Sequence, residues 1–230
     1  AGAIVYIYPQ KTSLYAALGT DDLTIRLAIM SRTGSGEMVS YNNIETLQLK
    51  DKSTGETLET FNVNRESSAS DKDYSFTIPV KSYFSEAMNR KFVVVATDDG
   101  GNTAQKTISV TAVNLKLSRV WALYKTLQEG SGLVTMTDVF KLSSANKSTV
   151  TAHIKVGEEW KLISQTSVAS TRSQDLQINV SSLELTHGAY TVRIVAQDVE
   201  SGVWSNYQFF DVMIVNPSSL MPIVSLAHSE

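Results

Sequence analysis

The sequence predicts an all-β protein built of two similar β-sandwich domains in tandem, and three observations lead to this prediction. Apolar and polar residues alternate with a period of two along several segments, which is the pattern of strands that bury one face. Turn-forming residues separate these segments at intervals of about 10 to 15 residues, as in a sandwich, and no long helical pattern lies between them. Three segments also recur in the same order about 100 residues later, which indicates two copies of one domain.

Five segments show the strand pattern most clearly, namely 23–29, 76–80, 92–96, 150–156 and 190–196. The first and fourth alternate strictly, so each is expected to bury the face that carries the apolar residues. The third and fifth are denser in β-branched residues, as strands in the middle of a sheet are. Pro79 cannot donate to a strand ladder, so its strand is expected at an edge or with this residue facing outward. One short helical piece is expected over 82–88.

The internal repeat sets the expected domain boundaries. At shifts of 100 to 102 residues, the segments 76–80, 96–98 and 110–114 fall on 176–180, 196–198 and 212–216. We therefore expect one sandwich over 1–114 and a second over 115–216, with 217–230 as a tail or the start of a truncated further domain. The junction lacks glycine and any Gly/Ser/Pro run, so we expect an end-to-end pair with limited bending.

The repeated core of each copy carries a recognisable signature. Residues 92–102 read FVVVATDDGGN, and residues 188–198 read GAYTVRIVAQD. Both resemble the A-x-D strand and glycine-containing turn of bacterial immunoglobulin-like domains. This resemblance implies tandem immunoglobulin-like β-sandwiches of an exported or cell-surface protein. It also places Tyr190 at the corner tyrosine, whose hydroxyl bonds back to a nearby turn, whereas the first copy has Asn89-Arg90-Lys91 there.

Composition excludes several classes of function. The chain holds 20 Lys and Arg against 23 Asp and Glu, a net charge of −3, which argues against nucleic-acid or anionic-membrane partners. No run of 18 apolar residues is present, so no membrane span is expected. The absence of cysteine removes disulfides, thiolate catalysis and cysteine-ligated metals, and it fits a cytosolic protein or a bacterial export product.

Localisation follows from the resemblance and from the start of the chain. Ala1-Gly2-Ala3 lacks the basic region of a signal peptide, so we expect a mature or trimmed chain. We expect a monomer that is exported to the cell surface or periplasm of a bacterium, and an upstream lipid anchor stays open.

Catalytic patterns are not found. His153, His187 and His228 have no metal-ligand spacing, and no G-x-S-x-G motif occurs. Glu158 and Glu159 are adjacent on a strand-like segment, so their side chains point to opposite faces. We therefore expect no catalytic residue, no cofactor and no enzymatic activity.

One turn offers a weak candidate for calcium. Asp98, Asp99 and Asn102 bring three oxygen-bearing side chains into one tight turn, while Asp21, Asp22, Asp71 and Asp73 are expected near a domain end. The alternative is a structural hairpin, since Asp and Asn tolerate left-handed backbone. The second copy keeps only Asp198, which favours the structural interpretation and the prediction of no metal site.

The three tryptophans all lie in the second copy and suggest a ligand surface. Trp160 is expected at a hairpin tip, and Trp204 precedes Asn206 and Tyr207. These four residues are candidates for binding a glycan. The alternative is that sandwich domains bury tryptophans or lay them over loops, and Trp121 is expected in the core.

Two hypotheses for function follow. The first is a non-catalytic exported or cell-surface module that serves as a structural spacer, adhesion or interaction domain. The alternative is a glycan-binding surface protein that uses exposed aromatic residues of the second domain. The expected partner is accordingly a glycan or a protein ligand.

Overall fold

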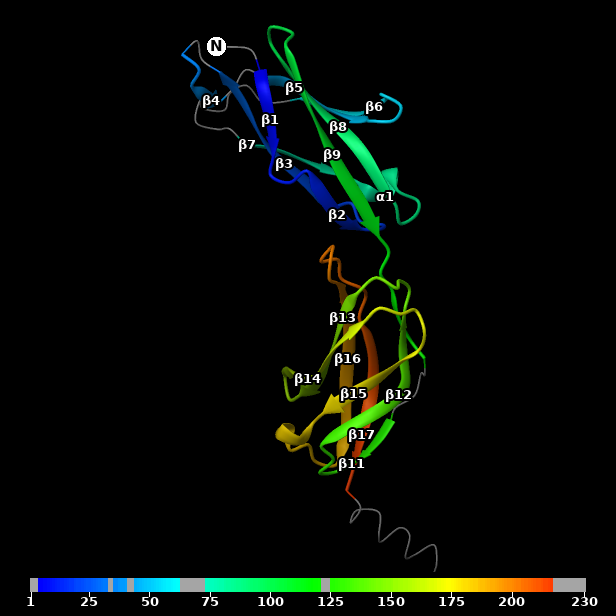
Figure 1. The fold of residues 1–230 in the computed structure, drawn as a ribbon. Coiled ribbons are helices and arrows are strands. Elements are labelled where there is room, and N and C mark those ends of the chain that lie inside the picture. The colour runs from blue at the N-terminus through cyan, green and yellow to red at the C-terminus, as the bar shows by residue number, and fades with distance from the viewer. Residues whose placement is uncertain (1–3, 33–34, 41–43, 63–72, 121–124, 217–230) are drawn as a thin grey trace, which may run out of the picture. The chain divides into compact units, whose positions relative to one another are not determined.

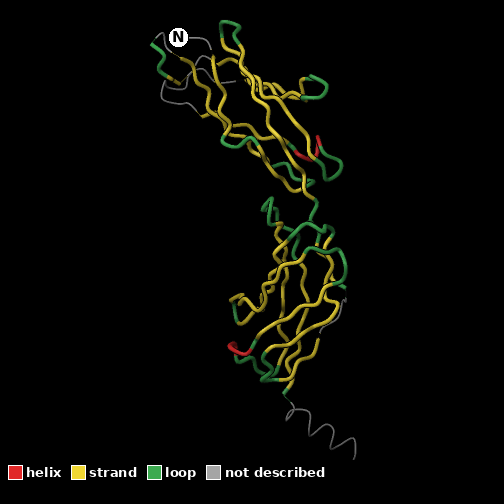
Figure 2. Tube along the Cα trace, in the orientation of Figure 1, coloured by secondary structure: helices red, strands yellow, loops and turns green. Residues whose placement is uncertain are grey.

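The computed structural model describes residues 4–32, 35–40, 44–62, 73–120 and 125–216. The chain divides into two compact units, Ala1–Val113 and Asn114–Glu230 (Figure 1). Strands dominate both, and within the described ranges the helical elements are α1 (Val80–Tyr83) and one 3-10 turn, Ser181–Leu183 (Figure 2). The prediction of an all-β protein is confirmed. No helix in these ranges is long and apolar enough to cross a membrane.

The first unit is a sandwich of two sheets. In the smaller sheet, β3 (Leu23–Arg32) pairs antiparallel with three strands: β1 (Ile4–Pro9), β4 (Met38–Ser40) and β7 (Asp73–Ile78). The larger sheet has the order β2-β9-β8-β5-β6: β2 (Ser13–Ala17), β9 (Thr103–Val113), β8 (Asn89–Asp98), β5 (Ile44–Asp51) and β6 (Thr57–Asn62). All of its pairs are antiparallel except β2 with β9, which is parallel.

The second unit repeats this connectivity. Its smaller sheet has the order β10-β12-β15: β10 (Leu117–Arg119), β12 (Leu133–Leu142) and β15 (Gln174–Asn179). Its larger sheet has the order β11-β17-β16-β13-β14: β11 (Lys125–Gln128), β17 (Gln208–Val215), β16 (Gly188–Asp198), β13 (Ser148–Val156) and β14 (Glu159–Val168). In both units the first strand is split, and its second half pairs in parallel with the last strand. This two-sheet arrangement is the immunoglobulin-like β-sandwich, and the chain carries two of them in tandem.

The predicted apolar faces form the cores. The alternating residues of β3 and β13 are buried: Leu23, Ile25, Leu27, Ile29, Val150, Ala152 and Ile154. The sequence repeat falls on equivalent inward positions, since Ile78 and Ile178 are both fully buried, as are Ala96 and Ala196. Period-two patterning and the repeat therefore report the same physical constraint, which is side-chain burial between two sheets.

The short helix begins earlier in the chain than predicted. Helix α1 begins at Val80, two residues before the predicted start at Ser82, and it ends at Tyr83. Pro79 follows the last residue of the edge strand β7 and caps α1, with φ −80° and ψ 99°. Because Val80 is fully buried, it fixes the turn at this point, and the predicted remainder is non-helical.

Candidate functional site

The most distinctive surface of the chain lies on the larger sheet of the second unit. Four residues from four neighbouring strands form one row across it: Leu162 faces His153, His153 faces Arg193, and Arg193 faces Phe209. Their chain neighbours Ile154, Val192, Ile194 and Phe210 are buried, so the row lies on the outer face. Leu162 is 54% exposed and Phe209 46%. We call this row, together with Trp160 and Tyr207, the aromatic face.

Arg193 lies at the centre of the aromatic face. Its Cζ is 4.3 Å from the centre of the Trp160 ring and 5.2 Å from that of Tyr207. The Phe209 ring lies 6.4 Å from Trp160 and 6.2 Å from Tyr207, measured between ring centres. Both cation–ring distances are within the range in which a guanidinium is attracted to a ring face. Two rings therefore lie against one positive charge, and Phe209 lies beside both of them.

Trp160 differs from its predicted place. It was expected at a hairpin tip, but the turn consists of Gly157 and Glu158, and Trp160 is the second residue of β14, opposite Lys155. Its side chain is partly covered, because Arg193 and, at 6.0 Å, the Lys155 ammonium lie over its ring.

The electrostatics of the aromatic face are set by the guanidinium of Arg193. Burial, followed by the charge of Arg193, lowers the pKa of His153 below its usual range. The Nε atom of Arg193 is buried and has no hydrogen-bond partner. Within the described ranges no carboxylate forms an ion pair with this guanidinium, whereas Arg90 of the first unit is paired with Asp51.

The remaining predicted ligand residues have different surroundings. Asn206 is occupied by the backbone of Leu117: its Oδ1 accepts from Leu117 N at 2.9 Å, and its Nδ2 donates to Leu117 O at 2.9 Å. Trp204 is 57% exposed and forms an isolated bridge with Gln197. The structure thus brings Trp160 and Tyr207 together, while Trp121 lies outside the described residues.

Sequence reasoning missed Arg193 and Phe209. Phe209 follows Tyr207 by two residues and could have been found from the strand period, but an arginine in a strand carries no comparable signal. Only the strand register places it beneath the rings.

The turn proposed for calcium is held together by its own side chains. Asp98 Oδ1 accepts from Gly100 N at 2.9 Å and Asn102 N at 2.7 Å, and Oδ2 accepts from Asn102 Nδ2 at 3.0 Å. Asp198 anchors the corresponding turn through Ser201. Among the residues that the structure describes, no group of three His, Asp or Glu side chains could hold a metal ion. These contacts support the structural interpretation of the turn, whose other member Asp99 is exposed.

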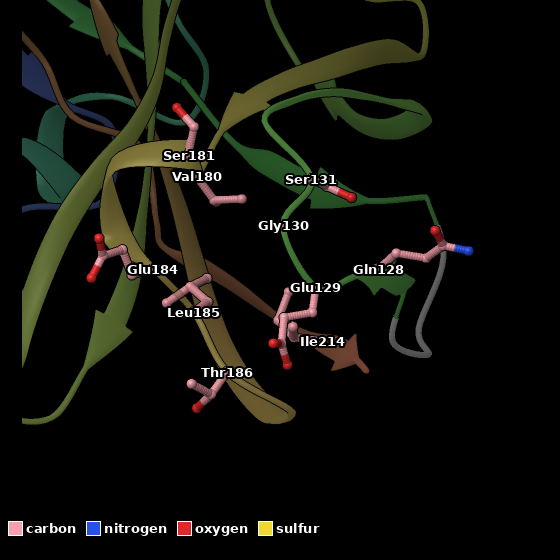
Figure 3. A pocket seen from close by; sticks show the side chains of 10 residues that line it. All are labelled: Gln128, Glu129, Gly130, Ser131, Val180, Ser181, Glu184, Leu185, Thr186 and Ile214. Atoms are coloured by element: carbon pink, nitrogen blue, oxygen red, sulfur yellow. The ribbon is translucent and has the colours of Figure 1, made fainter. Parts of the chain in front are cut away.

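A pocket of about 260 Å³ lies at the end of the second unit (Figure 3). Glu129 and Glu184 lie on either side of Leu185 in this view, and Ser131 and Ser181 lie above them. None of the ten lining residues is a His, Lys or Arg that could serve as a base or bind an anion. Its polar lining consists of two carboxylates, three hydroxyls and one amide.

Comparisons with known proteins concern the fold alone. No protein family and no curated protein matches the sequence. Among solved structures, the fibronectin(III)-like modules of Clostridium thermocellum CbhA align with TM-score 0.46 and 8% identity, over 93% of this chain and 96% of that one. A tetra-tandem repeat from the extending region of a large adhesion protein aligns with TM-score 0.33 and 16% identity, over 93% and 49%. A titin tandem of Ig domains gives 0.29 and 14%, over 94% and 99%. The assignment of the fold stands on the strand order described above.

Proposed function

We propose that the chain is a non-catalytic spacer and interaction module of an exported or cell-surface protein. The observation that supports this function is the parallel pairing of the first and last strands of the larger sheet in each unit. β2 pairs with β9 from Ser13–Ser109 to Ala17–Val113, so the chain enters at one end of the pair and leaves at the other. Tension along the chain then loads all hydrogen bonds of the pair together, in shear.

The pairs extend beyond the strand ends. Leu18 N donates to Val113 O at 2.9 Å, and Glu129 N donates to Val215 O at 2.7 Å. In a parallel pair, every second residue points its backbone N–H at the partner strand. Because the N–H of Glu129 points at β17, those of Leu127 and Lys125 do so as well. In each unit, hydrogen bonds thus join the first and last strands of the larger sheet, which are the strands that tension on a spacer would pull apart.

Single-molecule force spectroscopy on the whole chain tests the spacer function. Lys125→Pro removes a ladder donor of β11, because proline has no N–H. Its matched control is Ile163→Ala on β14, a buried residue of the opposite edge strand, which lowers stability by about 2 to 4 kcal/mol through a cavity. We expect Lys125→Pro to lower the unfolding force of the second unit more than Ile163→Ala does. A larger loss of unfolding force in Ile163→Ala than in Lys125→Pro would contradict a mechanical role of the β11–β17 pair.

A second candidate function is glycan binding, and the exposed rings of the aromatic face favour it. Tyr207 is 51% exposed, and its ring lies 6.2 Å from that of Phe209, tilted by 35°. Exposed rings side by side suit stacking on the apolar faces of successive sugars. Isothermal titration calorimetry with a panel of neutral and acidic oligosaccharides tests this candidate, with Tyr207→Ala as the variant that should lose binding.

A further inference from the structure

We infer that the aromatic face binds a glycan that carries carboxylate groups, a uronate-containing oligosaccharide, and that Arg193 holds the carboxylate. This inference rests on the glycan-binding candidate and names its ligand class.

The guanidinium of Arg193 lies against two aromatic rings. Its Cζ is 4.3 Å from the centre of the Trp160 ring and 5.2 Å from that of Tyr207, and a cation–ring contact leaves N–H bonds available to an acceptor. The Nε atom has no acceptor and is itself buried, so a ligand would meet the two Nη groups. A planar guanidinium without an acceptor matches a carboxylate, which accepts two parallel hydrogen bonds in that plane. A neutral sugar offers hydroxyls but no such acceptor pair.

The fold does not require this set of residues. Strand register matches the row Leu162, His153, Arg193 and Phe209 of the second unit with the row Thr57, Lys50, Val93 and Thr107 of the first. The first unit forms the same sheet with two threonines and a valine in place of the leucine, the phenylalanine and the arginine. A contiguous exposed apolar and aromatic surface therefore marks an interaction site rather than a need of the sandwich.

The longer hairpin of the second unit supplies the covering ring. In the first unit the β5–β6 pairing ends at Lys50 and Thr57, whereas β13 and β14 continue past the matching pair to Lys155 and Trp160. Trp160 thus comes from an extension that the first unit lacks, and it reaches back over Arg193.

The charges around Arg193 favour an anion. The Lys155 ammonium lies 6.0 Å from the centre of the Trp160 ring. His153, beside Arg193 on β13, has a lowered pKa and adds no charge at neutral pH. The acidic residue on the same face of β17 is Asp211, which accepts a hydrogen bond from Thr191 at 3.3 Å. Glu159 alternates with Trp160 along β14 and so lies on the other face, where it pairs with Lys161 at 2.6 Å. The two cations Arg193 and Lys155 therefore outnumber the carboxylate of Asp211 on this face, which attracts a carboxylate-bearing ligand.

The backbone beneath the face favours a glycan over an acidic peptide. Around Arg193, β13 and β16 are internal strands, each paired on both sides, and the open edge of β14 lies beyond Leu162. An extended peptide gains much of its affinity from main-chain hydrogen bonds to an open sheet edge, which the strands of Arg193 and His153 do not offer. A ligand here is held by rings and charge alone, which is sufficient for stacked sugar rings with a carboxylate.

Calorimetry with the whole chain tests the inference. The probes are tetragalacturonate, its methyl ester, an oligomannuronate, a hyaluronan tetrasaccharide, neutral cellotetraose and an oligoglutamate peptide. We expect at least one uronate to bind, and its affinity to fall about tenfold or more in Arg193→Gln, because a charged hydrogen bond is lost. Tyr207→Ala should weaken binding as well, and Arg193→Lys should restore only part of it, since lysine lacks the planar fork.

The matched controls come from the first unit. Thr107→Ala and Lys50→Gln change the positions that correspond to Phe209 and His153, and both should leave affinity unchanged. Thermal unfolding of every variant shows that the fold is kept, and Tyr207→Ala, at an exposed position, keeps the test valid if Arg193→Gln fails to fold.

Each other outcome overturns the inference in a different way. If the methyl ester and cellotetraose bind as well as the uronates and Arg193→Gln has no effect, glycan binding stands and the carboxylate contact is wrong. If the peptide binds through Arg193 and no uronate does, the face serves a protein partner. If no probe binds at millimolar concentration, both glycan proposals fail, while the spacer function is decided separately by force.

Discussion

The two units stabilise the same corner of the sandwich with hydrogen bonds from different side chains. In the second unit, Tyr190 donates its hydroxyl to Thr186 O at 3.0 Å, which confirms the corner tyrosine predicted for this position. In the first unit, the matching Arg90 donates Nη1 to Tyr83 O at 2.6 Å. A phenol and a guanidinium thus make the same bond back to the preceding turn.

The guanidinium brings a charge that the phenol does not, and a second position changes with it. Asp51 faces Phe92, and Ile154 faces the matching Val192, so Asp51 and Ile154 occupy one register position. Asp51 is buried and forms an ion pair with Arg90, whereas Ile154 is a core residue. Asp51 also accepts bonds from Ser53 N and Oγ at 2.8 and 2.6 Å. A charged corner requires a buried counter-charge, and the neutral corner leaves that position to the core.

Among changes to the corner contacts themselves, the largest effect is expected from Asp51→Ala. It leaves the largely covered guanidinium of Arg90 without its counter-charge and should lower the free energy of unfolding of the first unit by about 3 kcal/mol. The matched change in the second unit, Ile154→Val, should cost about 1 kcal/mol. Urea unfolding separates the transitions of the two units when two signals are followed. All three tryptophans lie in the second unit, so their fluorescence reports on it alone, and far-UV circular dichroism reports on both.

A double replacement sharpens the test. Asp51→Ile with Arg90→Tyr installs the pair of the second unit in the first, and it should recover part of the stability that Asp51→Ala loses. Equal stabilities of Asp51→Ala and wild type would show that the ion pair does not hold the corner.

Acid should unfold the first unit before the second. The hydrogen bond from the Ser53 hydroxyl, and then that from Arg90, holds the pKa of Asp51 well below its usual range. A depressed pKa gives stability that is complete above the unfolded-state pKa, near 4, and that is lost as the pH falls below it. Between pH 5 and pH 2 the first unit should lose about 2 kcal/mol through this group. Far-UV circular dichroism and tryptophan fluorescence, followed together, measure the two units, and Asp51→Asn should flatten the difference.

Tyr190→Phe is expected to have a smaller effect. It removes the hydroxyl that bonds to Thr186 O and should cost the second unit about 1 kcal/mol. Tryptophan fluorescence in urea measures the change. A cost near zero would mean that water replaces the bond at this half-buried site.

Local patterns predicted the fold, and long-range register decided the site. Period two and the repeat identified the buried faces, because burial between sheets leaves its mark on every second residue. The pair of Asp51 and Arg90 spans 39 residues, and its contact depends on how β5 lies against β8. Arg193 likewise acquires its surroundings only where β14 and β17 bring rings over β16. Trp160 was identified as a candidate, but its strand position depends on where a two-residue turn falls.

The smallest effect concerns the turn before the corner, where the units also differ. Glu184 has left-handed backbone, with φ 50° and ψ 47°, whereas the matching Phe84 is extended, with φ −129°. Phe84 is buried, while Glu184 is exposed at the pocket of Figure 3.

A side chain in left-handed backbone is strained, and glycine removes that strain but gains entropy in the unfolded chain. Glu184→Gly should therefore raise the stability of the second unit by about 0.5 kcal/mol. Phe84→Gly, at the matching position, should instead lower that of the first unit by about 3 kcal/mol or more, since it empties a buried ring site. Urea unfolding of both variants measures the two signs, and a loss of stability in Glu184→Gly would show that the side chain contributes more than the strain it imposes.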